Sequence, residues 1–330
     1  MKLPEASRFA EPFVHLVKIR FAKIASSRKL VAAMNHDSIA ELLNVTKRFG
    51  TVVALDRFDL AVRRGELLAL LGPNGAGKTT AISLLLGLQQ PNSGTARLFG
   101  QSPNLIEPRR QVGVMMQEAA LAPELRVREQ IELVASYYPR PLSPDEALEI
   151  TGTAPLGMRP YGKLSAGQKR QVQFALAIVG WPILLFLDEP TVGLDIQSRE
   201  MVWATLRCLV DEGRSIVLTT HYLEEAEALA DRVVVLAKGR PIATGTVSEM
   251  RALVVRKRIT CRTVLSAEQV ATWPDVQTVT SDQHGLHITA SNTENVVRHL
   301  LASDDDLQDL EVQRAGLAEA FTELTQEAAK

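Results

Sequence analysis

A glycine-rich segment, Gly72–Thr80, follows the apolar run Leu67–Leu71 and precedes the helix-like run Ala81–Leu88. Glycines let backbone N–H groups close around phosphate oxygens, and the N-terminus of a following helix adds positive potential. The Lys78 ammonium suits the β- and γ-phosphates of a nucleoside triphosphate, and the Thr79 hydroxyl suits Mg²⁺. A chance lysine in a glycine-rich turn is the alternative, which the strand–loop–helix context disfavours. The predicted phosphate-binding residues are Gly72, Pro73, Asn74, Gly75, Ala76, Gly77, Lys78, Thr79 and Thr80.

Two carboxylates, Asp188 and Glu189, come directly after the apolar run Ile183–Leu187. An acidic pair after a strand is commonly only a polar strand end, but together with a phosphate-binding loop it becomes a candidate for catalysis. We expect Asp188 to hold Mg²⁺, usually through water, and Glu189 to orient the water that attacks the γ-phosphate. The chain lacks the Asn-Lys-x-Asp segment typical of guanine-reading enzymes. These residues predict hydrolysis of a nucleoside triphosphate.

The composition excludes several classes of protein. The 330 residues are enough for one large domain and a small one. Hydrophobic residues make up 46% of the chain, enough for a sizeable buried core, and charged residues make up 23%. The formal net charge of −1 gives no bulk electrostatic reason to bind nucleic acid. No run approaches the roughly 18 consecutive apolar residues of a spanning helix, so we do not expect the chain to cross a membrane. Cys208 and Cys261 stand at no metal-ligand or redox spacing and predict reduced thiols in a cytosolic protein.

Residues 1–36 are expected to form a basic N-terminal extension. Within residues 1–33, seven lysines and arginines face only two glutamates. Four apolar residues recur there at helical spacing between the basic ones, as in a helix that lies on a membrane surface. The alternative is an extension without fixed structure, or sequence upstream of a start at Met34. The four apolar residues are Phe13, Val17, Phe21 and Ile24.

From residue 37 to residue 245, strand-like and helix-like segments alternate and predict an α/β domain. Phe58, Leu60 and Val62 recur with the period of a half-buried strand. The other runs are continuous, which suits strands with helices packed over both faces of the sheet. Between about residues 118 and 180 the pattern is helical, through Val127–Tyr138 and Gly167–Val179, and predicts an inserted helical subdomain. The continuous runs are Leu67–Leu71, Val112–Met116, Ile183–Leu187, Ile216–Leu218 and Val233–Leu236.

A small accessory domain is expected over residues 246–330. Thr246–Glu249 and Ser266–Gln269 both resemble capping boxes, the second before a short helix. The elements then read strand, helix, strand, strand, helix, strand, with a last helix from Leu317, which predicts an α+β, ferredoxin-like fold. They are strand Arg258–Leu265, helix Ser266–Trp273, strand Val276–Ser281, strand Leu286–Ala290, helix Asn292–Leu301 and strand Leu307–Gln313.

Segment Leu164–Gln168, Leu-Ser-Ala-Gly-Gln, closely resembles the signature of ABC transporter ATP-binding subunits. The family usually has Leu-Ser-Gly-Gly-Gln, so Ala166 adds a methyl group where backbone approaches phosphate. Asp188 lies 20 positions after Gln168, a separation that also matches the family.

Four single residues complete the resemblance, in family order over about residues 39–245. Gln117 is similar to the Q-loop glutamine, Asp195 to the D-loop aspartate and His221 to the switch histidine. Phe49 occupies the place of the aromatic that stacks on adenine. Alone, such a histidine is more often structural and such a Phe-Gly is usually a turn, so the assignment of Phe49 and His221 rests on the resemblance.

The resemblance implies an ATPase domain of the P-loop type that binds ATP and Mg²⁺ and works as a pair. Thr79, Gln117 and Asp188 would hold the metal ion, while Glu189, His221, Gln117 and Lys78 would act in catalysis. In the family two motor domains face head to tail. Ser165, Gly167, Gln168 and Asp195 would therefore help to enclose nucleotide between the two copies.

The ending Gly316–Leu324 resembles the C-terminus common in the exporter branch that serves drugs, lipids and polysaccharides, the daunorubicin-resistance type. This implies export through an integral membrane permease on a separate chain, at the cytoplasmic face of the membrane. The insert from Gln117 to Leu164 is short for the family, so the subdomain that receives the permease is expected to be trimmed.

Two other functions stay open. One is a soluble ABC ATPase acting on nucleic acid or ribosomes, which usually has two motor domains or a long coiled coil; this chain shows one motor, and we expect no nucleic-acid partner. The other is a regulatory ATP switch. Co-purification with a membrane protein would separate the transporter from both.

Overall fold

The computed structural model describes residues 38–117, 119–253, 257–282, 285–314 and 321. The chain divides between Thr244 and Gly245 into two compact units. The expectations for residues 1–36 and for a last helix from Leu317 fall on residues outside the described ones, apart from Phe321. Among the helices that the structure describes, none is long and apolar enough to span a bilayer.

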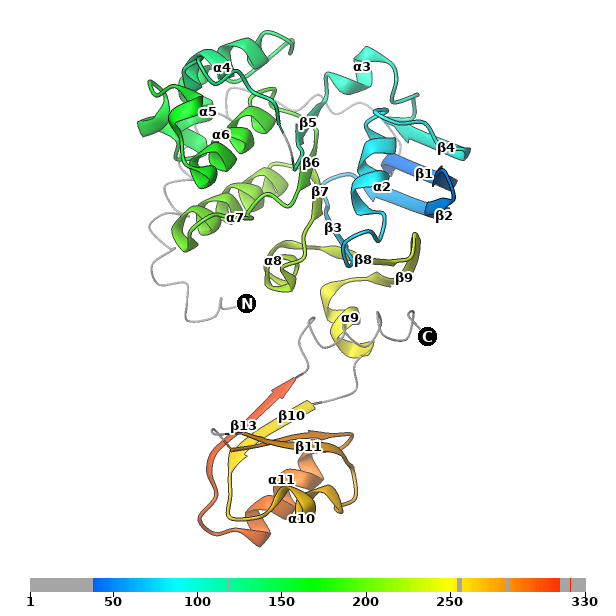
Figure 1. Cartoon of the computed structure of the whole chain (residues 1–330), viewed down its shortest axis with the longest axis vertical. Coiled ribbons are helices and arrows are strands. Elements are labelled where there is room, and N and C mark those ends of the chain that lie inside the picture. Colours follow the sequence, from blue (N-terminus) through cyan, green and yellow to red (C-terminus); the bar gives the residue numbers. More distant parts are fainter. Residues whose placement is uncertain (1–37, 118, 254–256, 283–284, 315–320, 322–330) are drawn as a thin grey trace. The chain divides into compact units, whose positions relative to one another are not determined.

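The first unit is built around a six-stranded sheet in the order β5-β6-β7-β3-β8-β9 (Figure 1). Every residue of β3, β6 and β7 is buried, as expected for continuous apolar runs covered on both faces. The pairs β5–β6, β6–β7, β7–β3 and β3–β8 are parallel, so their carboxyl ends meet at one edge. The strands are β3 (Leu67–Leu71), β5 (Val112–Met115), β6 (Leu184–Asp188), β7 (Ser215–Thr219), β8 (Arg232–Ala237) and β9 (Arg240–Gly245).

The first unit also contains a three-stranded antiparallel sheet in the order β2-β1-β4. It consists of β1 (Ser38–Phe49), β2 (Val52–Arg63) and β4 (Ser93–Leu98). Phe58, Leu60 and Val62 of β2 are buried, as their alternation predicts. They share a core with α2 (Lys78–Leu85), which follows β3; α3 (Ile106–Arg109) precedes β5.

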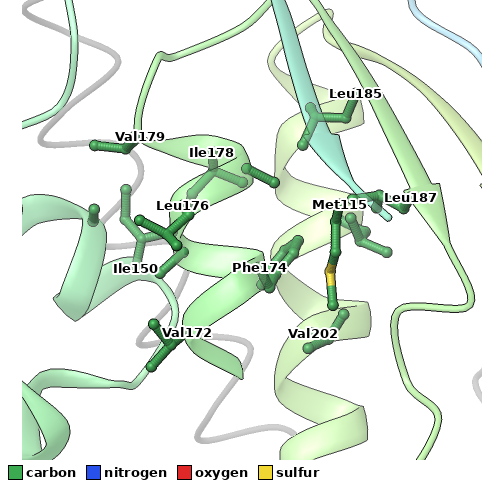
Figure 2. Close-up of a cluster of buried hydrophobic side chains, with 14 of the residues drawn as sticks. Met115, Ile150, Val172, Phe174, Leu176, Ile178, Val179, Leu185, Leu187 and Val202 are labelled. Carbon is green, nitrogen blue, oxygen red and sulfur yellow. The ribbon is translucent and has the colours of Figure 1, made fainter. Parts of the chain in front are cut away.

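The expected helical insertion lies between β5 and β6. It holds α4 (Val127–Ala135), α5 (Pro144–Ile150), the short 3-10 turns Ala154–Leu156 and Tyr161–Lys163, and α6 (Ala166–Ile178). Ser143 and Ser165 cap α5 and α6, each with a reciprocal capping box. Figure 2 shows Phe174 of α6 among Met115, Leu187 and Val202, so α6 is anchored on the central sheet. Two more helices, α7 (Ile196–Asp211) and α8 (Leu223–Leu229), follow β6 and β7.

The second unit begins with α9 (Val247–Leu253) and contains a four-stranded antiparallel sheet in the order β11-β12-β10-β13. Its elements follow one another in the expected order, with bounds shifted by up to three residues. Ile259, Ile288, Val296 and Leu300 belong to its own core. The elements are β10 (Lys257–Arg262), α10 (Ala267–Ala271), β11 (Val276–Asp282), β12 (Gly285–Ala290), α11 (Thr293–Ser303) and β13 (Gln308–Arg314).

Candidate functional site

The glycine-rich loop joins the end of β3 to the start of α2. Gly77, at φ 109°, precedes the helix, and Gly75 has φ 80°. A Cβ atom at Gly77 would lie 2.6 Å from the carbonyl oxygen of Ala54, so a side chain there would collide with β2. Because glycine offers no capping side chain, the first N–H groups of α2 stay available to an anion.

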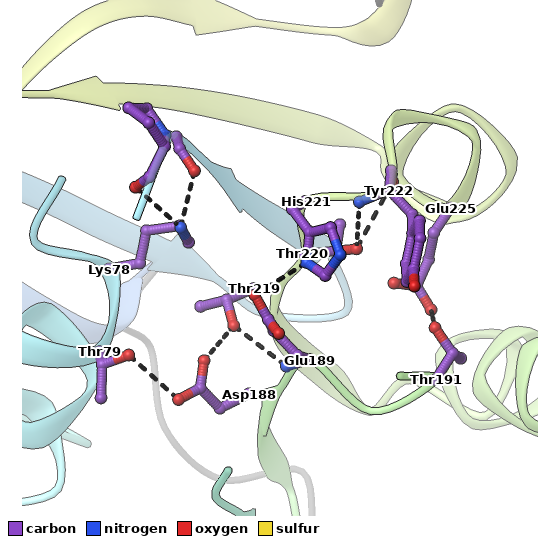
Figure 3. A network of polar contacts seen from close by, with 12 residues as sticks. Lys78, Thr79, Asp188, Glu189, Thr191, Thr219, Thr220, His221, Tyr222 and Glu225 are labelled. Carbon is purple, nitrogen blue, oxygen red and sulfur yellow. Dashed lines mark hydrogen bonds and ion pairs between the residues drawn. The ribbon is translucent and has the colours of Figure 1, made fainter. Parts of the chain in front are cut away.

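Lys78 is the first residue of α2, and its side chain folds back over the loop. The Nζ atom donates to the carbonyl oxygens of Gly72 at 2.7 Å and Pro73 at 3.2 Å (Figure 3). Burial lowers the pKa of Lys78, while the negative charges of Glu189 and Asp188 raise it. The ammonium is thus held in the loop that is expected to receive phosphate.

Asp188 ends β6 and accepts hydrogen bonds from two hydroxyl groups. Thr79 Oγ1 lies 3.1 Å from Asp188 Oδ2, and Thr219 Oγ1 donates to Asp188 Oδ1. Asp188 is 2% exposed. A carboxylate and a hydroxyl that face each other are hard oxygen donors of the kind that Mg²⁺ prefers, so the residues present fit that ion. Thr219 is not among the residues predicted from the sequence, although it is paired with Asp188 in the β6–β7 register.

Glu189 adopts a backbone conformation that is uncommon for residues other than glycine, with φ 51°. Its N–H donates to the carbonyl oxygen and to Oγ1 of Thr219, at 3.0 and 3.2 Å. Its carboxylate oxygen Oε1 lies 3.0 Å from Nδ1 of His221. The structure therefore brings the two predicted γ-phosphate residues into contact, as Figure 3 shows.

Arg170, on α6, is a further residue of the site that the sequence does not single out. One guanidinium nitrogen donates to the carbonyl oxygens of Met116 and Gln117, at 3.1 and 3.4 Å. The other donates to the carbonyl oxygens of Asp188 and Glu189, the latter at 2.6 Å. Gln117 is exposed just beyond β5, and Arg170 thus connects its backbone to the backbone of Asp188 and Glu189. No sequence signal identifies this role, because the acceptors lie in two other segments.

The predicted signature surrounds the N-terminus of α6. The Ser165 hydroxyl accepts from the N–H of Gln168, and the Gln168 side chain accepts from the N–H of Ser165, both at 3.2 Å. A Cβ atom at Gly167 would lie 3.0 Å from the carbonyl oxygen of Gly193, so the signature and the D-loop approach closely. Ala166 is exposed, and its methyl group is accommodated.

Asp195 caps α7. Its carboxylate accepts from the N–H of Ser198 at 2.8 Å and from the Ser198 hydroxyl at 3.0 Å. The backbone hydrogen bond from Ser198 is the main reason that the pKa of Asp195 lies below its ordinary value. The predicted D-loop aspartate therefore fixes the start of its own helix.

Phe49 is the last residue of β1 and is 47% exposed, with Lys47 Nζ 5.1 Å from the ring centroid. The hairpin that carries it contacts the phosphate-binding loop through Ala54. An exposed aromatic face there is suited to stacking on a base. Of the predicted residues, Lys78, Thr79, Asp188, Glu189 and His221 converge in one polar network, whereas Phe49, Ser165 and Gln168 make their described contacts outside it.

Comparison with known proteins matches residues 55–192 to a family model described as ABC transporter. A "Nod factor export ATP-binding protein I" from Burkholderia lata is 42% identical over 209 residues, which cover 61% of this chain and 69% of that protein. "Daunorubicin resistance ATP-binding protein DrrA3" from Streptomyces coeruleorubidus is 37% identical over 296 residues, covering 84% of this chain and 93% of that one.

Solved structures give the same result. A bacterial ABC transporter cassette in a dimeric structure matches with a TM-score of 0.58 and 26% identity, covering 63% of this chain and 98% of that chain. The same cassette in a dimeric post-hydrolysis state, bound to ADP and Pi, matches with 25% identity and the same TM-score and coverage.

Proposed function

The chain belongs to the family of ABC transporter ATP-binding subunits and is an ATPase, and we propose that it powers export through a separate integral membrane permease. The relatives named for Nod factor export and daunorubicin resistance support export. The observation that carries the proposal is the network in which Thr79 and Asp188 meet beside the Glu189–His221 contact. It places hard oxygen donors next to a carboxylate able to act on water.

Each residue of the network has a chemical role in this proposal. Lys78 and the N–H groups of the loop bind the phosphates of ATP. Thr79, Asp188 and Gln117 would hold Mg²⁺, which when bound neutralises charge on the phosphate oxygens. Glu189 orients the attacking water and accepts its proton. It is positioned for this by the carboxyl end of β7, because Thr219 bonds to its N–H and His221, two residues beyond the strand, contacts its carboxylate.

His221 and Phe49 also contact the nucleotide in this proposal. A ring nitrogen of His221 hydrogen-bonds the γ-phosphate or its water, beside the carboxylate of Glu189. Phe49 stacks on adenine from the hairpin that contacts the loop.

We further propose that two copies of the chain work together. Ser165 is exposed at the N-terminus of α6, where its N–H groups and hydroxyl suit a phosphate bound by another copy. The likeness to a cassette solved as a dimer supports this arrangement. Gly167, Gln168 and Asp195 would then complete the nucleotide sites across the pair, at the cytoplasmic face of the membrane.

Co-purification from detergent-solubilised membranes tests the proposed function. A tagged chain should retain one polytopic membrane protein through purification, and reconstitution of the two should raise the ATPase rate. Glu189→Gln is the matched control: it should keep the membrane protein but lose the stimulated rate. Recovery of ribosomes or nucleic acid, with no membrane protein that stimulates hydrolysis, would overturn the proposal.

A further inference from the structure

A buried cation lies between the signature helix and the ends of two strands. Arg170 is 8% exposed and sits on α6, five residues after Ser165. No carboxylate pairs with its guanidinium in the hydrogen bonds described. Its acceptors are instead the four carbonyl oxygens at the ends of β5 and β6, with Oε1 of Gln173 at 3.1 Å. A buried charge is costly unless it is paired and hydrogen-bonded, so this arrangement compensates the charge with carbonyl dipoles.

The geometry requires a guanidinium. One nitrogen serves the β5 end, at Met116 and Gln117, while the other serves the β6 end, at Asp188 and Glu189. Only a planar fork with several donors on separate nitrogens can reach two strand ends at once; a lysine ammonium is a single point.

These contacts also explain how Glu189 keeps its backbone conformation. At φ 51° the peptide is held from both sides: its N–H by Thr219 and its carbonyl oxygen by Arg170. Residues in this region persist where surrounding contacts fix them. Removal of either contact therefore frees the peptide that aims the carboxylate.

We infer that Arg170 is a positioning residue that joins the signature helix to the backbone of Gln117 and Glu189 in the same chain. The inference rests on the proposed function, in which Ser165 meets nucleotide bound by a second copy. Ser165 and Arg170 are about 7.5 Å apart along the helix axis, at 1.5 Å per residue. A shift of α6 on contact with the second copy's nucleotide would therefore move the carboxylates of its own site.

Arg214 provides a matched control for this inference. It is 4% exposed and donates to the carbonyl oxygens of Trp181 and Pro182, at 3.1 and 3.0 Å. These lie just before β6, whereas Arg170 binds the other end of that strand. Both are buried arginines on main-chain acceptors, so both should contribute to stability, but only Arg170 contacts the site.

The experiment compares Arg170→Lys and Arg170→Met with Arg214→Lys and Arg214→Met. All four should lower the Tm. The Arg170 variants should lower kcat by about tenfold or more, Met more than Lys, because a small misplacement of a reacting group has a large effect on rate. KM for ATP should stay within about threefold, since Lys78 and the loop are untouched. The Arg214 variants should keep kcat within about twofold once corrected for folded fraction.

A kcat within twofold of wild type in Arg170→Lys would overturn the inference. An equal loss of kcat in the Arg170 and Arg214 variants would also overturn it. If neither Arg170 variant folds, Gln173→Leu tests the same point, because it removes one acceptor that orients the guanidinium. An unchanged kcat in that variant would also overturn it. The proposed function fails separately, when the wild-type chain itself shows no hydrolysis that depends on Glu189.

Discussion

The Nδ1 atom of His221 lies 3.0 Å from Oε1 of Glu189, and this contact joins the ends of two neighbouring strands. Glu189 directly follows β6, while His221 follows β7 by two residues. Thr219, the last residue of β7, binds both Asp188 and the N–H of Glu189. The relative position of metal-binding and water-binding groups is therefore determined by the register of one pair of parallel strands.

Glu189→Gln should reduce hydrolysis by about a hundredfold or more, because the amide keeps the shape of the side chain but cannot accept a proton. ATP affinity should remain within about threefold, since the phosphate contacts lie on other residues. Steady-state ATPase assays and nucleotide titration measure the two quantities. The same variant should accumulate an ATP-bound dimer on size-exclusion chromatography. Glu212→Gln, at an exposed site beyond α7, is the control and should behave as wild type.

Lys78→Ala should weaken ATP binding itself, because it removes a charge-assisted contact to two phosphates. The variant also loses the hydrogen bonds that the ammonium donates to the carbonyl oxygens of Gly72 and Pro73 in the loop. Titration with a fluorescent ATP analogue should show the loss. Unchanged affinity would mean that the loop is not the phosphate site.

Thr219→Val should raise the Mg²⁺ concentration required for half-maximal ATPase activity by about tenfold. This is the lower end of the usual loss of metal affinity when a residue that orients a metal ligand is removed. Valine keeps the shape of threonine but cannot donate to Asp188 or accept from Glu189. Thr205→Val is the matched control: Thr205 is fully buried too, but its hydroxyl donates to the main-chain carbonyl oxygens of Met201 on α7 and Ile150 on α5. An equal Mg²⁺ requirement in both variants would contradict the assignment.

Glu225 predicts a pH dependence of stability. It is fully buried, and burial raises its pKa above the ordinary 4.5, although hydrogen bonds from Thr220, Thr191 and Trp203 oppose the shift. Between 4.5 and the folded-state pKa, the folded chain binds more protons than the unfolded chain. Ionisation of Glu225 therefore lowers the free energy of unfolding as pH rises through that window. The whole of this decrease is present above the folded-state pKa.

Glu225→Gln abolishes this titration while Oε1 can still accept from Thr191 and Trp203. The Tm of the variant relative to wild type should therefore increase as pH is raised from 4 to 8. Glu224→Gln, exposed on the same helix, should show no such trend. A difference in Tm that does not vary with pH in Glu225→Gln would show that its pKa is not raised.

The sequence predicts this fold well where a pattern is local. The continuous run Leu67–Leu71 has the same bounds as β3, and the run before Asp188 is shifted by one residue, because buried parallel strands are marked by uninterrupted apolar residues. The first turn of α2 is different: the helix begins at Lys78 rather than Ala81, since the left-handed Gly77 already starts it.

Contacts between distant segments could not be predicted in this way. Arg170 reads as one more polar residue after the signature, and Thr219 as the last residue of a strand. Their roles depend on acceptors 18 and 31 residues away in the chain, respectively. Asp195 has a second role that its motif does not predict, because its carboxylate caps α7.

The last prediction concerns Ser165, which has two roles to separate. Its hydroxyl caps α6, and the proposed dimer also places it against nucleotide bound by the second copy. Ser165→Arg should keep nucleotide binding by the monomer but block closure of the pair, through bulk at the phosphate contact. The lost cap alone costs about 1 kcal/mol. Ser143→Arg removes the equivalent capping box from α5 and should lower the Tm to a similar extent with nearly normal ATPase activity.

Mixing Ser165→Arg with Lys78→Ala tests the arrangement across the dimer. Each variant alone should be inactive, because both nucleotide sites of its homodimer carry the same defect. In the mixed dimer, one site combines the intact loop of the Ser165→Arg chain with the intact signature of the Lys78→Ala chain. The other site carries both defects. Partial ATPase activity should therefore reappear on mixing, provided that one site can turn over alone. Full activity in Ser165→Arg by itself would contradict the claim that this segment caps ATP, because the bulk of arginine would then meet no phosphate.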